Sequence, residues 1–369
     1  MMQHVIEYDE FGPEKILGVY DPKTGMRGFV VIDNTVLGPG KGGIRMTPTV
    51  SVEEVFRLAR TMTWKNAIAG LPFGGAKSGI IADAKAISPA KKESIVRAFS
   101  RGLKEVSPAE YIAAPDMNMA EREMAWYVEA NGDKKSATGK PKSMGGLPHE
   151  LGSTGFGVFH SALVAAEKMG LDPAKATVAI EGFGNVGRFA AKFLSEIGCS
   201  IVAVSDSKGA VHSHGKAIDF SKLAGIKDKT GSVINYRPGD TDYHESILEV
   251  GADILITAAV PDLIETRDVK KLKFKLIVEG SNIPMTHEVE QLIHKKGIVV
   301  VPDFVANAGG VISSYVEHTG GSEKEMFRLV EKKIKENTHK LMDRCDVENV
   351  DPRTCALNIA KERIREKEG

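Results

Sequence analysis

Three glycines between an apolar run and a helical segment constrain the fold of this chain most strongly. Gly182, Gly184 and Gly187 follow the apolar run at 177–180 and lead directly into a segment with helical character. In such a unit the first glycine allows a tight turn, the second lets the backbone approach a pyrophosphate, and the third lets helix and strand pack closely. A glycine-rich turn here is often only a turn. Its position before a helix N-terminus, which favours anions, nevertheless indicates a dinucleotide site.

A carboxylate in the expected place supports this interpretation. Asp206 follows the next predicted strand, 19 residues beyond Gly187, where a carboxylate accepts hydrogen bonds from the adenosine ribose. It favours NAD, because a carboxylate repels the 2′-phosphate of NADP. Lys208 and Lys216 are close in sequence and would offset that repulsion if they faced the site, but solvated loop charges explain them at least as well. The choice between NAD and NADP therefore stays open.

The region around this turn alternates short apolar runs with helical segments. The helical segments lie at 185–197 and 285–294. Strands are predicted at 177–180, 200–204, 253–257, 275–278 and 297–301. This alternation predicts a doubly wound α/β domain, in which helices cover a parallel sheet.

The N-terminal part has a different texture, with long helices and glycine-rich connections. Ser51 with Glu54 matches a capping box and predicts a helix over 52–68. Further helices are predicted from Pro89 to about residue 104 and over 120–130.

The C-terminal end is also predicted to be helical. Ser322 with Glu325 repeats the capping-box pattern, and the last 45 residues carry no strand signal. We expect these helices to pack on the N-terminal region rather than to extend the sheet.

Composition excludes several classes of function. The 49 basic and 49 acidic residues cancel, whereas a nucleic-acid-binding protein would carry a basic excess. There is no run of 18 uncharged apolar residues and no signal-peptide pattern, so we expect a cytoplasmic protein without a membrane segment. The three cysteines lack C-x-x-C spacing, no His-Glu-x-x-His occurs, and His212 with His214 reads as a polar loop pair. We therefore expect no metal site.

Lysines flanked by glycines are the second unusual feature. They lie in the segments 38–45, 63–66 and 71–79. The last segment is not a P-loop, because Ala76 and Leu71 stand where that motif needs glycine. Glycine flanks limit the bulk around each amine and suit the binding of a small anion.

Any one of these lysines is as well explained by a solvated surface charge. The explanation weakens for Lys65, which follows Met62 by three residues near the buried face of its helix and there needs a partner. It also weakens for Lys77, whose neighbours are small or apolar. Asp116 is a third polar candidate. Its surroundings favour a strand that ends in an Asx-type helix cap, but near several lysines the carboxylate becomes a candidate for proton transfer.

Five motifs follow one another in a characteristic order: residues 38–45, residues 63–79, Ala-Pro-Asp-Met-Asn at 114–118, the glycine turn at 182–187, and Ala-Asn-Ala-Gly-Gly at 306–310 with Ser-Ser-Tyr at 313–315. In this order they resemble the signatures of the glutamate/leucine/phenylalanine/valine dehydrogenases, over roughly residues 10–340. The resemblance implies an α/β protein with two domains around a deep cleft. One is a Rossmann-like NAD(P)-binding domain at 146–329, and the other is an α/β substrate-binding and assembly domain at 1–145, joined by C-terminal helices at 330–369. A homo-oligomer, often a hexamer, is also implied.

The resemblance further assigns roles to residues of this chain. Lys77 becomes the catalytic lysine and Asp116 the proton-transfer carboxylate of an oxidative deamination that releases ammonia, while Lys65 holds the substrate α-carboxylate. A lysine near other cations and away from bulk water has a lowered pKa and can act as a base. The implied cofactor-binding residues are Thr154, Gly182, Gly184, Asn185, Val186, Gly187, Asp206, Lys208, Asn282 and Asn307.

Lys41 and Ser314 favour L-glutamate as the substrate. The resemblance places both on the side-chain carboxylate, where the leucine branch has an apolar residue instead of the lysine. A lysine left unpaired in a closed site costs several kcal/mol, so an apolar substrate would be rejected. Leucine, valine or phenylalanine dehydrogenase is the alternative activity. The alternative of another class is a non-catalytic relative that binds NAD(P) or glutamate, against which the retention of Lys77 and Asp116 argues.

Two positions depart from the family pattern. Glu150 stands where many members have arginine, and Asp262 lies in a segment that usually reads Ala-Leu-x-Asn. Both departures bear on cofactor preference and local contacts more than on the reaction.

Overall fold

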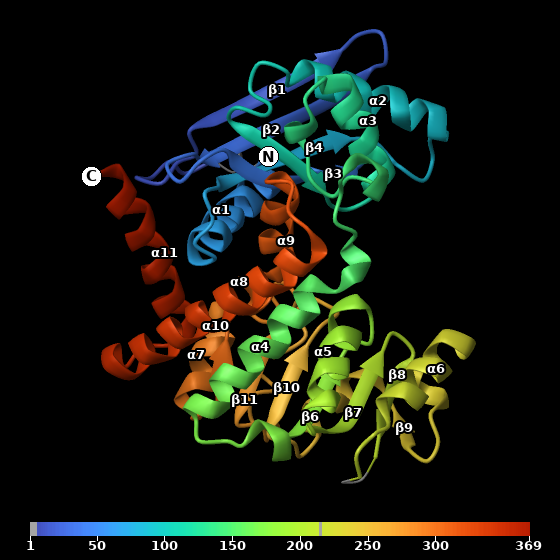
Figure 1. Cartoon of the computed structure of the whole chain (residues 1–369), viewed down its shortest axis with the longest axis vertical. Coiled ribbons are helices and arrows are strands. Elements are labelled where there is room, and N and C mark those ends of the chain that lie inside the picture. The colour runs from blue at the N-terminus through green and yellow to red at the C-terminus, as the bar shows by residue number, and fades with distance from the viewer. Residues whose placement is uncertain (1–5, 214–215) are drawn as a thin grey trace. The chain divides into compact units, whose positions relative to one another are not determined.

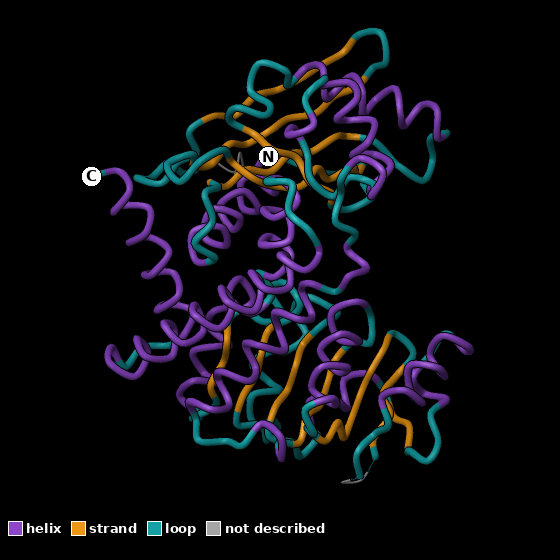
Figure 2. The backbone as a smooth tube through the Cα atoms, in the orientation of Figure 1, coloured by secondary structure: helices purple, strands orange, loops and turns teal. Residues whose placement is uncertain are grey.

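The computed structural model describes residues 6–213 and 216–369, and the chain divides into two compact units. The first unit comprises Met1–Leu151, Val311–Met326 and Ala360–Gly369. The second comprises Gly152–Gly310 and Phe327–Ile359. Both are α/β units, as Figures 1 and 2 show, so the predicted fold class is confirmed.

The first unit is built on a five-stranded mixed sheet. Its strands lie in the order β1, β2, β4, β3, β5, with β2 antiparallel to both of its neighbours and β3 parallel to β4 and β5. Their bounds are β1 Lys15–Asp21, β2 Met26–Asn34, β3 Gly40–Thr47, β4 Gly74–Ile81 and β5 Tyr111–Pro115. The helices of this part are α1 Val52–Ile68, α2 Pro89–Gly102 and α3 Glu121–Asn131.

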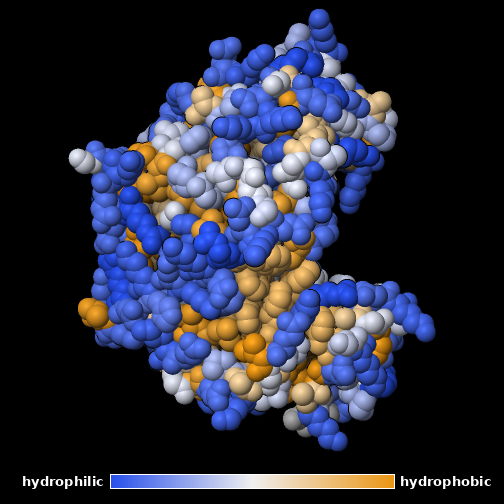
Figure 3. All heavy atoms as spheres, in the orientation of Figure 1, coloured by the Kyte–Doolittle hydropathy of each residue, from blue (hydrophilic) through white to orange (hydrophobic). Residues whose placement is uncertain are grey.

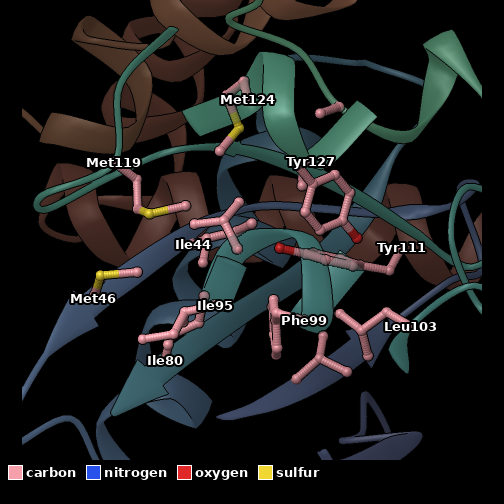
Figure 4. Close-up of a cluster of buried hydrophobic side chains, with 14 of the residues drawn as sticks. Ile44, Met46, Ile80, Ile95, Phe99, Leu103, Tyr111, Met119, Met124 and Tyr127 are labelled. Carbon is pink, nitrogen blue, oxygen red and sulfur yellow. The ribbon is translucent and has the colours of Figure 1, made fainter. Parts of the chain in front are cut away.

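Alternation along β2 gives the sheet two apolar faces. Phe29 and Val31 pack with Val55 and Ala59 of α1, whereas Val30 belongs to the larger core under α2 and α3. Figure 4 shows this larger core, whose labelled side chains are Ile44, Met46, Ile80, Ile95, Phe99, Leu103, Tyr111, Met119, Met124 and Tyr127.

The expectation of glycine-rich connections is wrong for the segments at 38–45 and 71–79, because most of their residues form strands β3 and β4. Glycine is required there by close backbone approach. A Cβ atom on Gly42 would lie 1.6 Å from the carbonyl oxygen of Ala76, and one on Gly75 would lie 2.0 Å from the Thr63 hydroxyl of α1. The missing side chains let β3, β4 and α1 pack directly against one another.

The predicted helix starts are confirmed. The Ser51 hydroxyl accepts a hydrogen bond from the Glu54 amide at 3.2 Å, and α1 spans the predicted residues. The Glu54 carboxylate, however, contacts the Arg45 guanidinium at 2.5 Å. Ala120 is the N-cap of α3, so the interpretation of Asp116 as a helix cap is wrong.

The second unit contains a seven-stranded sheet in the order β12, β11, β10, β6, β7, β8, β9. The five strands predicted from apolar runs are confirmed, and they are parallel. The antiparallel strands β8 and β9 were not predicted, because β8 has only four residues and β9 has three, all of them polar. The bounds are β6 Thr177–Glu181, β7 Ser200–Asp206, β8 Gly209–His212, β9 Asp240–Asp242, β10 Ile254–Thr257, β11 Leu276–Glu279 and β12 Val299–Val301.

Helices flank this sheet in the doubly wound manner (Figure 1). Their bounds are α4 Ser153–Lys168, α5 Asn185–Glu196, α6 Phe220–Thr230, α7 His287–Lys295 and α8 Asp303–Ala306. Helix α9 Gly309–His318 groups with the first unit from residue 311 onward, whereas the sequence placed it in the dinucleotide-binding domain. The core on one face includes Leu255 and Ile277 of the central strands with Val289 and Ile293 of α7. The predicted pair His212 and His214 is only partly visible, because His214 lies outside the described residues.

The C-terminal end is helical, as predicted, with α10 Glu323–Glu348 and α11 Pro352–Glu368. Polar side chains cover the face over α10 in Figure 3. Residues 327–359 group with the second unit, whereas the sequence placed residues 330–369 with the first. The reason is packing on α4, where the hydroxyls of Ser161 and Thr338 lie 3.2 Å apart and Phe156 contacts Phe327 edge to face. Among the described residues, no helix has the length and apolar character needed to cross a bilayer.

An unusual histidine lies in the core of the second unit. His160 of α4 is 5% exposed, and its ring lies 4.3 Å from Phe156 and 4.7 Å from Phe159, centroid to centroid. Neither ring nitrogen has a hydrogen-bond partner within the described structure. Burial lowers the pKa of this imidazole from 6.5 to about 4.

We predict that His160→Phe stabilises the protein. The change removes two unsatisfied polar atoms, each of which costs about 1–3 kcal/mol when buried. Because the native histidine resists protonation, the unfolded chain binds more protons between pH 6.5 and about 4, and wild-type stability falls as the pH drops through that window. Thermal unfolding measured from pH 4 to 8 should show a higher unfolding temperature for the variant than for the wild type. The unfolding temperature of the variant should also decrease less as the pH is lowered. His339→Gln, on an exposed part of α10, is the control, and an unstabilised His160→Phe variant would contradict the prediction.

Candidate functional site

The neighbouring parallel strands β4, β3 and β5 bring together residues that are distant in sequence. Lys77 lies on β4, Arg45 on β3, and Asp116 directly after β5. The Lys77 Nζ lies 2.9 Å from Asp116 Oδ2, and the Arg45 Nε lies 3.0 Å from the same oxygen. Sequence reasoning paired Lys77 with Asp116 but gave Arg45 no role. Its only signal was its place at the end of a glycine-rich motif.

Burial and charge act on this pair in opposite directions. Burial lowers the pKa of the Lys77 amine, although the Asp116 charge opposes the shift. Burial alone would raise the pKa of Asp116, but the charges of Lys77 and Arg45 outweigh it, and the pKa lies below its ordinary value. Gly43 makes room for the pair, since a Cβ atom there would lie 2.8 Å from the Asp116 Cβ and 3.2 Å from the Lys77 Nζ. The site thus holds an ionised carboxylate against an amine that releases its proton more readily than an exposed lysine does.

Lys41 lies deeper in the same sheet. Its side chain is buried, and Nζ donates to the carbonyl oxygen of Ala113 at 2.9 Å. Burial lowers the pKa of Lys41 to about 7; the nearby Glu317 opposes the shift, while Lys140 and Lys77 add to it. An amine of this kind gains strongly from an anion that enters the site.

Helix α9 carries Ser314 and, one turn later, the buried Glu317 on the same side. Glu317 lies 2.7 Å from the Lys140 Nζ and accepts hydrogen bonds from the amides of Gly139 and Leu147 at 3.0 Å. This buried ion pair fixes the helix that bears Ser314. The sequence analysis missed both partners, although a glutamate three residues after Ser314 beside apolar Val316 was a usable signal.

Lys65 occupies the last turn of α1 and is half-buried. Its neighbour Asn66 is fully buried and donates from Nδ2 to the Gly74 carbonyl oxygen at 2.6 Å. The end of α1 is therefore attached to the start of β4, the strand that carries Lys77.

In the second unit, the glycine turn has the geometry that dinucleotide binding requires. Gly182 has a φ of 89°, and a Cβ atom on Gly187 would lie 1.9 Å from the Gly182 carbonyl oxygen. A Cβ atom on Gly184 would meet nothing within 4 Å. The open space lies at the start of α5, where Asn185 and Val186 begin the helix. The residues therefore fit a pyrophosphate at this helix N-terminus.

Asp206 ends β7 and is buried, and four donors surround its carboxylate. Oδ1 accepts from the Lys208 amide at 2.9 Å and the Ser232 hydroxyl at 3.1 Å, and Oδ2 accepts from the Lys227 Nζ at 2.7 Å and the Val233 amide at 2.8 Å. These donors outweigh burial and lower the pKa of Asp206. Sequence reasoning considered Lys208 and Lys216, whose side chains are exposed, and missed Lys227 because it lies on α6.

The remaining predicted cofactor residues of this unit are Thr154, Asn282 and Asn307. The Asn307 Nδ2 donates to Asn282 Oδ1 at 3.0 Å. A Cβ atom on Gly310 would lie 3.0 Å from the Thr154 hydroxyl of α4, closer than an ordinary contact, so glycine at this position leaves that hydroxyl more room. The departure at Asp262 has a local structural reason. The residue has a φ of 51° and its amide donates to the Ile283 carbonyl oxygen at 3.0 Å, which ties its loop to the one carrying Asn282.

Two family models match the chain. The model for glutamate/leucine/phenylalanine/valine dehydrogenase matches residues 145–368, and the model for the Glu/Leu/Phe/Val dehydrogenase dimerisation domain matches residues 13–131.

Individual relatives give the same result. The chain is 40% identical to glutamate dehydrogenase of Aeropyrum pernix over 90% of this chain and 83% of that protein. It is 40% identical to NADP-specific glutamate dehydrogenase of Saccharolobus shibatae over 90% and 82%. The solved structure of glutamate dehydrogenase from Peptoniphilus asaccharolyticus superposes with a TM-score of 0.85 at 29% identity, covering 96% of this chain and 91% of that chain. The hetero-hexameric glutamate dehydrogenase from Thermus thermophilus in its Leu-bound form gives a TM-score of 0.84 at 28% identity, covering 96% and 89%.

We predict that two glycine substitutions in the turn separate binding from folding. Gly184→Ala should unfold at the wild-type temperature, because its Cβ meets nothing within 4 Å, but should weaken NADH binding by about tenfold or more by filling the phosphate approach. Gly187→Ala should lower the unfolding temperature, because its Cβ would overlap a backbone oxygen. Thermal unfolding and fluorescence titration with NADH measure the two effects. Unchanged NADH affinity in a folded Gly184→Ala variant would contradict the assignment.

Proposed function

Because this chain belongs to the glutamate/leucine/phenylalanine/valine dehydrogenase family, we propose that it catalyses the NAD(P)-dependent oxidative deamination of L-glutamate to 2-oxoglutarate and ammonia, and the reverse reductive amination. Membership makes the protein an amino-acid dehydrogenase that acts on a CH–NH₂ group. The contact between the buried Lys77 and the half-buried Asp116 is the observation that carries the proposal.

The two side chains divide the proton transfers. The nicotinamide ring, when bound, accepts the hydride from Cα. Lys77, with its lowered amine pKa, takes the proton from the water that attacks the resulting iminium carbon. Asp116 is ionised in the free protein, so its carboxylate can accept a proton from the substrate amino group and return it later in the reaction. Lys65 holds the α-carboxylate and so orients Cα.

Lys41 and Ser314 support glutamate over apolar amino acids. Lys41 is fully enclosed, and its amine has a backbone carbonyl oxygen as its hydrogen-bond partner rather than a carboxylate. A substrate side-chain carboxylate would supply the missing anion, whereas an aliphatic side chain would leave the amine uncompensated. Ser314 adds a neutral hydroxyl donor for the same carboxylate.

The environment of Asp206 supports the use of both NAD and NADP. A bare carboxylate would exclude the 2′-phosphate of NADP, but Lys227 lies 2.7 Å away and balances the charge. Lys208 adds an exposed positive charge beside it. An NADP-specific relative at 40% identity is consistent with this arrangement.

The proposed assembly is a homo-oligomer, with a hexamer favoured. The match to a dimerisation domain and the hexameric state of the Thermus thermophilus enzyme support it. We place the protein in the cytoplasm, where its three cysteines remain free thiols, as they are in the structure.

The test of the proposed function is initial-rate measurement with NAD and with NADP on glutamate, leucine, valine and phenylalanine. We expect turnover on glutamate with both coenzymes. Lys77→Ala should lower kcat by about 10²–10⁴-fold through loss of the base. NADH binding should not change, because the glycine turn lies in the other unit. Silence on all four amino acids with intact coenzyme binding would favour a regulatory relative instead.

A second prediction concerns substrate choice. Lys41→Leu should lower kcat/KM for glutamate by about 10²–10⁴-fold, because the substrate carboxylate loses its buried charge partner, a loss of about 3–5 kcal/mol. The same variant should gain activity on leucine, whose side chain then meets an apolar wall. Steady-state kinetics on both substrates measures the change. Arg27→Leu, an exposed position on β2, is the control. An equal loss on both substrates would assign Lys41 a structural role.

A further inference from the structure

Asp116 is held by two cations on one of its two oxygens. Lys77 Nζ and Arg45 Nε both contact Oδ2, at 2.9 and 3.0 Å. The Arg45 guanidinium also reaches Glu54 of α1, with NH1 at 2.5 Å from Oε1. The four residues form a continuous chain of alternating charge from Glu54 through Arg45 and Asp116 to Lys77.

This row of charged side chains is shielded from solvent enough for its charges to act on one another. The side chains of Lys77, Arg45 and Asp116 are 9%, 19% and 23% exposed. Charges in such surroundings interact more strongly than pairs in open water. Arg45 is also restrained at both ends, because Nε and NH1 contact different carboxylates.

The signs of these charges have opposite consequences for the Lys77 amine. Asp116 stabilises the ammonium form, and burial and Arg45 destabilise it. Glu54 lies on the far side of Arg45 and stabilises the ammonium form weakly. Lys41 on β3 also interacts with Lys77, and it has the same sign as Arg45. Arg45 therefore competes with Lys77 for the charge of Asp116.

We propose that Arg45 is a positioning residue, which fixes the Asp116 carboxylate through Oδ2, presents Oδ1 to the substrate amino group, and keeps Lys77 available as a base. The inference rests on the proposed function for its chemistry. Glu54 serves the same arrangement by restraining the guanidinium, which explains why its carboxylate does not complete the capping box of α1.

The pH profile of kcat/KM for glutamate tests the role of Arg45. Arg45→Met removes the positive neighbour of Lys77, so the rising limb of the profile should move to higher pH by about one unit. At pH values below the limb, the rates should then be about tenfold lower than those of the wild type. Glu54→Gln removes a negative neighbour, so the limb should move the opposite way by a smaller amount. Arg45→Lys keeps the charge, and its limb should stay in place while kcat falls, because lysine lacks the fork that spans both carboxylates.

A parallel loss of rate at every pH in Arg45→Met, or limbs that shift in the same direction in Arg45→Met and Glu54→Gln, would overturn the inference. Damage to packing alone lowers the rate or the stability of both variants but does not move their limbs in opposite directions.

A second measurement does not depend on turnover. Competitive acetylation with peptide mass spectrometry gives the apparent pKa of the Lys77 amine in the wild type, Arg45→Met and Glu54→Gln. We expect the same opposite shifts, with Lys92, which pairs with Glu123, unchanged as an internal control. If the wild type is inactive on glutamate but these shifts occur, the proposed function fails and the electrostatic role of Arg45 stands. Absence of the shifts in an active enzyme rejects the role of Arg45 and leaves the proposed function intact.

Discussion

The first unit depends on the absence of side chains along two neighbouring strands. A Cβ atom on Gly42 would overlap the backbone of β4, and one on Gly75 would overlap Thr63 of α1. Without those atoms, sheet and helix approach closely enough to enclose Lys41 and Lys77, whose amines leave water almost completely. The chemistry of the unit follows from this packing, because an amine in open solvent keeps its ordinary pKa and cannot act as a base near neutrality.

Enclosure carries a cost that the surrounding charges only partly offset. Lys77 has Asp116 as a direct partner, but it shares that carboxylate with Arg45. Lys41 donates to a carbonyl oxygen, and Glu317, the carboxylate that opposes the lowering of its pKa, is itself paired with Lys140. Each buried lysine is thus under-compensated, which is costly for stability and useful for binding anions. Active sites commonly have such a balance.

The sequence predicted the second unit far better than the first. Parallel strands that are buried on both faces appear in the sequence as apolar runs. The spacing of the glycines from Gly182 to Gly187, directly before a helix, indicates a dinucleotide site. Strands β3 and β4 were read as connections because their glycines reflect contacts with other elements, which local sequence does not contain. Arg45 was missed for a similar reason. Glu54 stood where a capping box needs it, and only the folded sheet shows that its carboxylate contacts Arg45.

Binding of the proposed substrate is coupled to the protonation of the Lys41 amine. With its pKa lowered to about 7, the Lys41 amine titrates near neutral pH rather than in the alkaline range of an exposed lysine. A carboxylate brought beside the amine favours the ammonium form, so binding of a dicarboxylate takes up a proton, whereas binding of an aliphatic amino acid does not. Recognition of the side-chain carboxylate therefore combines a new ion pair with the protonation of a group that burial had held close to neutral. The proposed preference for glutamate then rests on the burial of Lys41, and that burial depends on the close packing that glycines in β3 and β4 allow.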